Sequence, residues 1–177
     1  MTAIVIRPGG PRDVAAVVAL WDRAISWLVA RDQLGQWGGE PVSARPQTVS
    51  RVQEWARGPG LRIASLDGAA VGASVISDSC PPYVAAVQVP ETYLTFLVSD
   101  RDHAGEGIGS ELVARAAREA RAAGSELLRV DCWAGAPGLV AWYERQGFSR
   151  TTTFEVNGDW RGQVFEMPLD AVVDRAG

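Results

Sequence analysis

The sequence contains no lysine, and all 17 of its positively charged residues are arginine. It has one histidine, His103, and two cysteines, Cys80 and Cys132, which are far apart in the chain. The missing lysines exclude a Schiff-base enzyme and a phosphate-binding loop that ends in Gly-Lys-Ser/Thr. The scarcity of histidine and cysteine excludes a zinc site of the His/Cys type within one chain, so we expect no metal.

Long apolar runs and export signals are also missing. No stretch approaches the ~20 apolar residues that a transmembrane helix needs. Residues 1–7 carry neither the basic region nor the cleavage site of a signal peptide. Two cysteines are too few for a secreted disulfide scaffold. We therefore expect a cytoplasmic protein with no membrane partner, and the net charge of −4 argues against a nucleic-acid partner.

What remains is the composition of a globular protein. The chain has 177 residues, of which 47% are hydrophobic and 21% charged. This length and composition predict a single domain over residues 1–177. The pattern predicts helices over residues 11–30, 46–57, 108–123 and 139–146, and strands over 4–6, 61–66, 70–76, 93–98, 127–133, 151–156 and 163–167. Asp67-Gly68 and Asn157-Gly158 predict hairpin turns, so we expect one mixed α+β domain.

The chemistry is concentrated in a glycine-rich segment between a strand and a long helix. Gly105, Gly107 and Gly109 alternate with other residues just where the helix begins. Glycines at a helix start expose several backbone N–H groups to one point, and the helix dipole adds partial positive charge. This pattern predicts an anion cradle for phosphate or pyrophosphate that needs no lysine. A plain glycine-rich turn between strand and helix is the alternative.

A dinucleotide-binding fold is a second alternative for these glycines. Its pattern is Gly-x-Gly-x-x-Gly in a tight turn directly after a strand. Here Ser110 stands where the third glycine belongs, and several polar residues separate the strand end near Val98 from Gly105. Asp131, on the next predicted strand, is the one feature that suits this alternative, which we rank below the following one.

Two motifs resemble the GNAT acetyltransferase superfamily. Ala104-Gly105-Glu106-Gly107-Ile108-Gly109 resembles the acyl-CoA-binding motif Arg/Gln-x-x-Gly-x-Gly/Ala, except at its first place. Trp142-Tyr143-Glu144-Arg145-Gln146-Gly147-Phe148 is similar to the Leu-Tyr-x-x-x-Gly-Phe end of the family's last conserved helix. The resemblance covers most of the chain and is strongest over residues 93–148. It implies an αβα-layered α+β fold, with a central, mostly antiparallel twisted sheet flanked by helices.

The resemblance also implies a reaction and its residues. An acetyl group would pass from acetyl-CoA to a primary amine of a small molecule or peptide, by direct attack in a ternary complex. Tyr143 would protonate the leaving CoA thiolate, and Glu91, or else Asp131, is the candidate base. The backbone of Leu97, Val98 and Ser99 would bind the pantetheine arm. The cofactor phosphates would be bound by Ala104, Gly105, Glu106, Gly107, Ile108, Gly109 and Ser110.

The acceptor side is less defined by the pattern. Trp27, Gln36 and Trp37 lie in the region that lines the acceptor pocket in this family, although core packing is the simpler interpretation of Trp27. Arg101 is our candidate for a side-chain contact to the CoA phosphates, and an exposed loop residue is the simpler interpretation of His103.

The sequence departs from the family pattern at two places. Ala104 replaces the usual Arg or Gln, and Ala136 stands where many relatives have Asn before the last helix. The alternative function is therefore a non-catalytic protein of the same fold that binds CoA or another small molecule. A homodimer is also compatible with the family.

Overall fold

The computed structural model describes residues 3–170. The helices are α1 (Val14–Val29), α2 (Pro46–Arg57), α3 (Ile108–Ala122) and α4 (Pro137–Arg145), with 3-10 turns η1 (Pro11–Asp13), η2 (Val42–Ala44) and η3 (Arg101–His103). The strands are β1 (Val5–Pro8), β2 (Leu61–Leu66), β3 (Ala69–Ser77), β4 (Glu91–Ser99), β5 (Leu127–Trp133), β6 (Ser149–Val156) and β7 (Trp160–Pro168). None of the helices within this range has the length and apolar character needed to cross a membrane.

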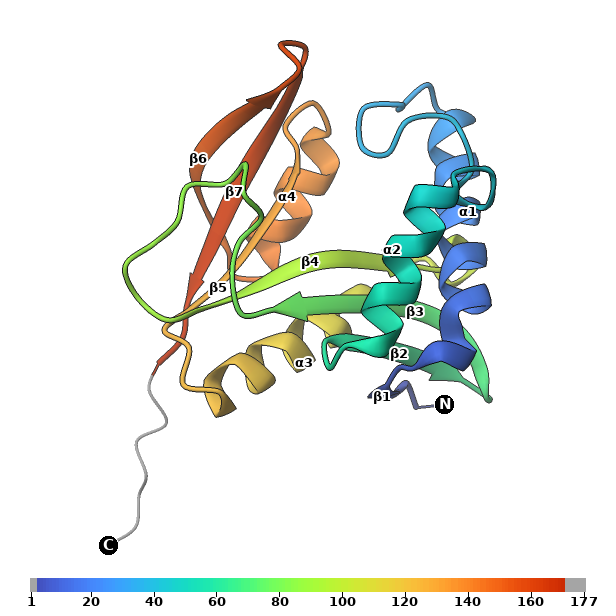
Figure 1. Cartoon of the computed structure of the whole chain (residues 1–177), viewed down its shortest axis with the longest axis horizontal. Helices are drawn as coiled ribbons and strands as arrows, with labels where there is room; N and C mark the ends of the chain where they lie inside the picture. The colour runs from blue at the N-terminus through green and yellow to red at the C-terminus, as the bar shows by residue number, and fades with distance from the viewer. Residues whose placement is uncertain (1–2, 171–177) are drawn as a thin grey trace, which may run out of the picture. The chain divides into compact units, whose positions relative to one another are not determined.

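The strands form a seven-stranded sheet in the order β1-β2-β3-β4-β5-β7-β6 (Figure 1). The pairs β1–β2, β2–β3, β5–β7 and β6–β7 are antiparallel, whereas β4 and β5 are parallel. This mixed, mostly antiparallel sheet with its helices confirms the predicted α+β fold.

The two predicted hairpin turns are confirmed by their backbone angles. Asp67 and Gly68 have φ of 48° and 82°, and Asn157 and Gly158 have φ of 54° and 82°. Leu66 pairs with Ala69, so Asp67-Gly68 is a two-residue turn of type I′, which needs positive φ at both positions. Val156 pairs with Trp160, so Asn157 and Gly158 belong to a three-residue connection.

By its internal contacts the chain divides into two units. Unit 1 comprises Met1–Ile76 and Phe96–Leu112, and unit 2 comprises Ser77–Thr95 and Val113–Gly177. The strand β4 and the helix α3 therefore each contribute residues to both units. The single domain over residues 1–177 stays a prediction, and its ends, residues 1–2 and 171–177, lie outside the described range.

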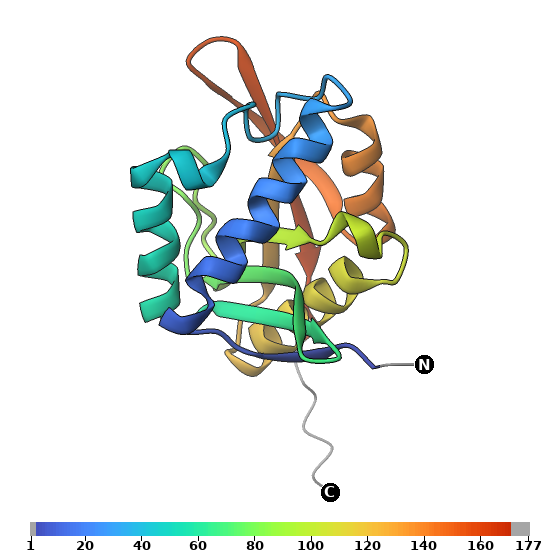
Figure 2. The same ribbon diagram turned by 90° about the vertical axis from the view of Figure 1, so that its right-hand side faces the viewer.

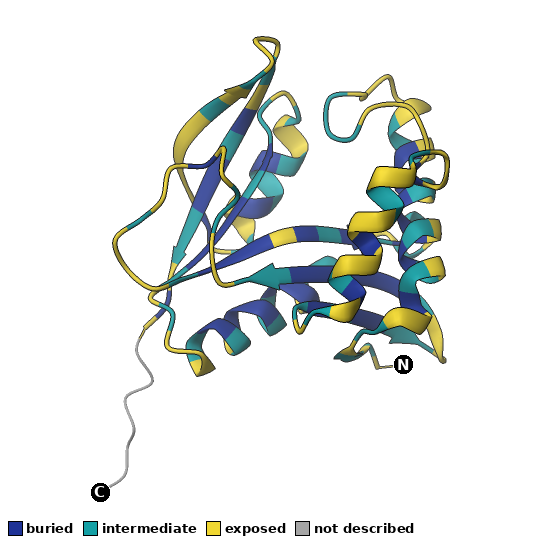
Figure 3. Cartoon of the chain, in the orientation of Figure 1, coloured by how far each residue is buried: buried dark blue, intermediate teal, exposed yellow. Residues whose placement is uncertain are grey.

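In unit 1, helices α1 and α2 lie side by side over one face of β2 and β3 (Figures 1 and 2). Helix α2 begins with Pro46 at its first position and ends where the Gly58 N–H bonds to the carbonyl of Glu54, 3.1 Å away. Its inward residues join a core that also contains α1 and the end of β4, and the outward sides of both helices are exposed (Figure 3). Both helices are therefore amphipathic, with an apolar side toward the core and a polar side toward solvent.

The start of α3 packs on the opposite face of β2 and β3. On β2, Ile63 joins the core under α1, whereas its neighbour Ala64 packs with Ile108 and Leu112 of α3. The contact is close because β3 has a glycine there. A Cβ on Gly72 would lie 2.6 Å from Cγ2 of Ile108 and 3.1 Å from Cδ1 of Leu112. Gly72 thus sets how near the first turn of α3 comes to the sheet, which nothing in the sequence pattern indicated.

We expect Gly72→Ala to lower the free energy of unfolding by about 1–3 kcal/mol, because an added methyl overfills this contact. It would also weaken binding of the CoA that the resemblance implies about tenfold, because the first turn of α3 has to move. Urea unfolding and calorimetry measure the two effects. Gly10→Ala is the control, since a Cβ there meets nothing within 4 Å. Equal effects of the two substitutions would contradict this role of Gly72.

Candidate active site

The glycine-rich segment of unit 1 lies at the start of α3, where the sequence predicts an anion cradle. The N–H of Glu111 bonds to the carbonyl of Gly107 at 2.9 Å, which starts α3 there. The N–H groups of residues 108–110 occupy the first turn, where no carbonyl of the same helix can accept them. Gly105 and Gly107 have φ of 88° and 81°, and a Cβ on either would meet no atom within 4 Å. The segment can thus present backbone donors to an anion, which fits the pyrophosphate of CoA.

An ion pair that the sequence pattern did not reveal fixes the turn before the cradle. Asp100 is 8% exposed and follows β4 directly. Its Oδ2 accepts a hydrogen bond from Nη2 of Arg23 on α1 at 2.8 Å, and its Oδ1 accepts one from the N–H of Asp102 at 3.2 Å. Burial alone would raise the pKa of Asp100, but these hydrogen bonds outweigh it and lower the pKa. Asp100 therefore stays ionised and ties η3 to α1.

The end of β4 precedes this turn in unit 1. Val98 is buried in the core under α1, while Leu97 packs on the opposite face with Ile108. Leu97 and Ser99 are both partly exposed. Their backbone contact to a pantetheine arm stays a prediction. In the loop that follows, Nδ1 of His103 lies 3.2 Å from Oε1 of Glu106.

Tyr143, the predicted acid, lies on α4 in unit 2. It is 5% exposed, and its ring contacts Phe148 and Phe165, with centroids 5.8 and 5.4 Å away. Within residues 3–170 its hydroxyl has no hydrogen-bond partner. Burial, and then the neighbouring Cys132 and Asp131, raise the pKa of Tyr143 above its ordinary value. The phenol therefore keeps its proton, which is the state a general acid requires.

This raised pKa predicts a pH dependence of stability. An ordinary tyrosine titrates near pH 10. Because the folded-state pKa of Tyr143 is higher, its contribution to stability is fully present below about pH 10 and is lost as the pH rises further. We expect Tyr143→Phe to flatten the alkaline fall of the unfolding free energy, measured by urea unfolding from about pH 8 to 11. An unchanged slope would mean that burial does not perturb this phenol.

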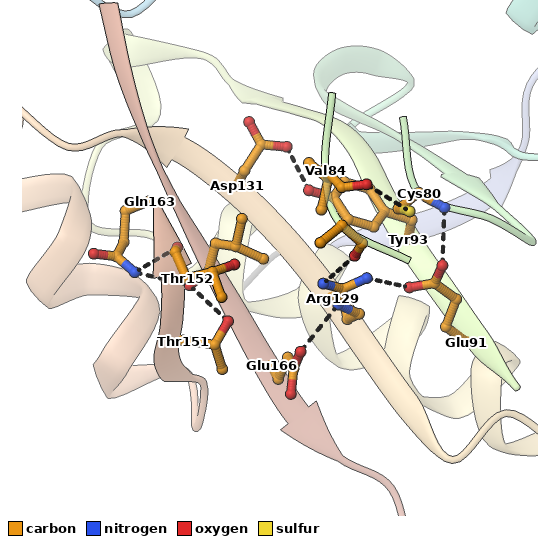
Figure 4. A network of polar contacts seen from close by, with 12 residues as sticks. Cys80, Val84, Glu91, Tyr93, Arg129, Asp131, Thr151, Thr152, Gln163 and Glu166 are labelled. Carbon is orange, nitrogen blue, oxygen red and sulfur yellow. Dashed lines mark hydrogen bonds and ion pairs between the residues drawn. The ribbon is translucent and has the colours of Figure 1, made fainter. Parts of the chain in front are cut away.

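Glu91, the predicted base, belongs to a buried ion pair in unit 2 (Figure 4). Its Oε2 accepts a hydrogen bond from Nη1 of Arg129 at 2.9 Å, and its Oε1 accepts one from the N–H of Cys80 at 3.0 Å. Arg129 is 2% exposed and also pairs with Glu166 at 3.2 Å and bonds to the carbonyl of Ala85 at 3.1 Å. Both oxygens of Glu91 are occupied, so it serves to hold Arg129 and the loop before β4.

We expect Glu91→Gln to lower the free energy of unfolding by about 2 kcal/mol, because buried Arg129 loses one of its two carboxylate partners. Catalytic turnover would change little. Glu155→Gln is the control, since its pair with Arg161 is exposed and is expected to contribute less than about 1 kcal/mol. Urea unfolding and a rate assay are the measurements. A large loss of turnover at unchanged stability would return Glu91 to the role of base.

Asp131 on β5 is the better candidate for a base. Its Oδ1 accepts a hydrogen bond from the hydroxyl of Tyr93 at 2.6 Å (Figure 4). Burial raises the pKa of Asp131, and the bond from Tyr93 offsets only part of that rise. A carboxylate with a raised pKa accepts a proton more readily at neutral pH. Its charge also acts on Tyr143, since it contributes to the raised pKa of that phenol.

The three predicted acceptor residues belong to unit 1 but differ in setting. Trp37 packs edge-on against Trp21 with centroids 5.7 Å apart and joins the core. Gln36 is half-buried in the loop between α1 and η2. Trp27 does not join that core, contrary to the simpler interpretation, and instead holds the guanidinium groups of Arg31 and Arg101 over its ring at 3.9 and 4.0 Å.

The two cysteines and the two alanines at the family-pattern positions contribute no reactive or hydrogen-bonding side chain to the site. Both cysteines are free, and burial raises the pKa of Cys132 to about 12, which makes it a poor nucleophile. Ala104 is exposed in the cradle segment, and Ala136 caps α4 without a side-chain hydrogen bond.

Known proteins resemble this chain in sequence pattern and in fold. A family model for the acetyltransferase (GNAT) family matches residues 21–148. No curated protein sequence matches the chain significantly.

Solved structures share the fold over nearly the whole chain. A GNAT-family acetyltransferase from Listeria monocytogenes has a TM-score of 0.73 at 18% identity, covering 94% of this chain and 95% of that one. Ribosomal-protein-alanine N-acetyltransferase from Brucella melitensis has a TM-score of 0.66 at 22% identity, and the match covers 93% of this chain and 99% of that one. The structure of yncA, a putative acetyltransferase from Salmonella typhimurium with its cofactor acetyl-CoA, has a TM-score of 0.64 at 18% identity. The match covers 99% of this chain and 97% of that one. At these identities the likeness shows the fold, and the family model shows the kinship: the chain belongs to the acetyltransferase (GNAT) family.

Proposed function

We propose that this acetyltransferase moves an acetyl group from acetyl-CoA to a primary amine of a small molecule or peptide. The observation that carries the proposal is the cradle at the start of α3, where two glycines at positive φ precede free N–H groups. Acetyl-CoA is also the cofactor of the yncA structure. In this proposal Gly105 to Ser110 bind the pyrophosphate, and the backbone of Leu97 to Ser99 binds the pantetheine arm.

The transfer would proceed by direct attack in a ternary complex. The amine nitrogen forms a bond to the thioester carbonyl carbon, and the carbon–sulfur bond breaks. Tyr143 gives its proton to the departing sulfur, which stabilises the developing thiolate. The proton lost by the amine passes to Asp131, directly or through water. These roles are supported by the protonated phenol, which has no hydrogen-bond partner among the described residues, and by the raised pKa of the carboxylate in the same unit.

Two measurements test the function. Thermal shift with CoA, acetyl-CoA and NAD identifies the cofactor class, and stabilisation by NAD alone would contradict the proposal. Release of CoA thiol from acetyl-CoA is then followed across a panel of amines. Stabilisation by CoA with no thiol release above the uncatalysed rate would favour a non-catalytic binding protein, the function that Ala104 and Ala136 motivate.

The remaining expectations rest on composition and family. We propose a cytoplasmic location because the cysteines are few and free. Absence of a metal and of a nucleic-acid partner, and assembly into a homodimer, likewise stay predictions, for which elemental analysis and light scattering are direct tests.

A further inference from the structure

Two arginines lie on one indole ring next to the cradle in unit 1. The guanidinium carbons of Arg31 and Arg101 are 3.9 and 4.0 Å from the ring centroid of Trp27. Arg31 is further held because its Nη1 donates to the carbonyl of Trp27 at 3.2 Å. Trp27 belongs to the last part of α1, and Arg101 belongs to η3, which directly precedes the glycine segment.

Neither guanidinium has an acidic partner. Within residues 3–170 the ion pairs of Arg23 and Arg129 are formed with buried carboxylates, whereas Arg31 and Arg101 form none. Nε of Arg101 is buried and has no hydrogen-bond partner. Burial, and then the charge of Arg31, lower the pKa of Arg101, so the two cations repel each other. Stacking on the indole offsets part of this repulsion, but the unused donors remain available.

Such an arrangement suits an anion with planar oxygens. A guanidinium presents its N–H donors in a fixed fork that matches carboxylate or phosphate. Contact with the Trp27 ring restrains both side chains, which reduces the entropy lost when a ligand orders them. An anion bound beside these guanidinium groups would also reduce the repulsion between them, which further favours binding.

We propose that Arg31, Arg101 and Trp27 form a subsite for an anionic group, a carboxylate or phosphate, carried by the acceptor amine. This rests on the proposed function and narrows the acceptor to amines that also bear an acid. The acceptor is the favoured source because Arg31 opens the loop that contains Gln36 and Trp37, and because the cradle already supplies backbone donors for the cofactor pyrophosphate. The 3′-phosphate of CoA is the other source of the same chemistry.

The experiment compares L-amino acids with their carboxamides as acetyl acceptors. We expect the wild-type chain to prefer the acids by about tenfold or more in kcat/KM, the range for a charge-assisted bidentate contact. Arg31→Gln and Arg101→Gln are each expected to bring the acid-to-amide ratio towards one. Arg51→Gln, which removes an exposed charge on α2, is the control and keeps the ratio. A ratio near one in the wild-type chain overturns the subsite.

Acetyl-dephospho-CoA distinguishes the two sources of the anion. If the acceptor carries it, removing the 3′-phosphate leaves the acid-to-amide ratio unchanged. If the arginine substitutions raise KM for acetyl-CoA but not for its dephospho form, the 3′-phosphate is the ligand and the proposal is overturned. Arg31 is exposed, so Arg31→Gln is expected to fold even where Arg101→Gln does not.

A binding measurement separates failure of the subsite from failure of the enzyme. The chain is saturated with CoA, and its melting temperature is followed with each amino acid and each carboxamide. Stabilisation by the acids alone, lost in Arg31→Gln, would support the subsite even without any acetyl transfer. Transfer to acids and amides at equal rates would support the enzyme and overturn the subsite. No discrimination in either measurement also overturns it.

Discussion

The substitution Gly107→Asp is expected to weaken CoA binding roughly 100-fold or more, because two penalties combine. Gly107 has a φ of 81°, which costs a non-glycine residue about 1 kcal/mol or more. The new carboxylate would also stand among the donors of the cradle and repel the pyrophosphate. Calorimetric titration with CoA measures the loss, and urea unfolding shows how much comes from the fold.

Gly158→Asp is a matched control for this experiment. Gly158 has a φ of 82°, and a Cβ there also meets no atom within 4 Å. It therefore carries the same backbone penalty in the β6–β7 turn, without a charge in the cradle. Gly107→Ala adds backbone strain without a charge. Its CoA affinity is expected to lie between that of the wild type and that of Gly107→Asp. Normal CoA affinity in Gly107→Asp would mean that the phosphates bind elsewhere on the chain.

The substitution Tyr143→Phe is expected to lower kcat by about 10²- to 10⁴-fold, the usual contribution of a general acid. CoA affinity would change little, because the lost proton matters only while the carbon–sulfur bond breaks. Folding would also change little, since the hydroxyl has no hydrogen-bond partner among residues 3–170. Steady-state rates of thiol release and calorimetric CoA binding measure the two quantities separately.

Tyr83→Phe is the matched control, because Tyr83 is 53% exposed and belongs to the same unit. It is expected to leave kcat unchanged. If Tyr143→Phe keeps full turnover, another group or water protonates the thiolate. If it instead loses CoA affinity with kcat intact, the phenol binds the cofactor and has no part in proton transfer.

The sequence predicted most elements of the fold because their signals are local. The helix expected over residues 46–57 is α2, bounded by Pro46 and Gly58, and the Asp67-Gly68 and Asn157-Gly158 turns have the positive φ that their residues favour. The cradle stays a prediction, and its signal is equally local, since it depends on glycine spacing at a helix start. Each of these features is decided by residues within a few positions of one another.

The sequence could not predict which charged groups meet. Glu91 and Arg129 are 38 residues apart, and Arg23 and Asp100 are 77 apart. A carboxylate at a strand edge has the same local pattern whether it is solvated or paired. The pattern that suggested Glu91 as the base therefore did not show that Arg129 and the N–H of Cys80 bond to its carboxylate. The position of Trp27 outside the core could not be predicted for the same reason. Helical spacing does not show which residues from other segments will contact a given face of the helix.

The sequence contains no lysine, so a phosphate site in this protein has to rely on backbone N–H groups and arginine. The sequence alone determined the glycine positions and the helix start, since φ and helix starts are set by neighbouring residues. Only the tertiary structure decided which arginines pair with a carboxylate. Arg23 and Arg129 form ion pairs with carboxylates that are far away in the sequence. Arg31 and Arg101 both contact the ring of Trp27, and neither forms an ion pair within the described residues 3–170. That outcome depends on chain segments that only folding brings together.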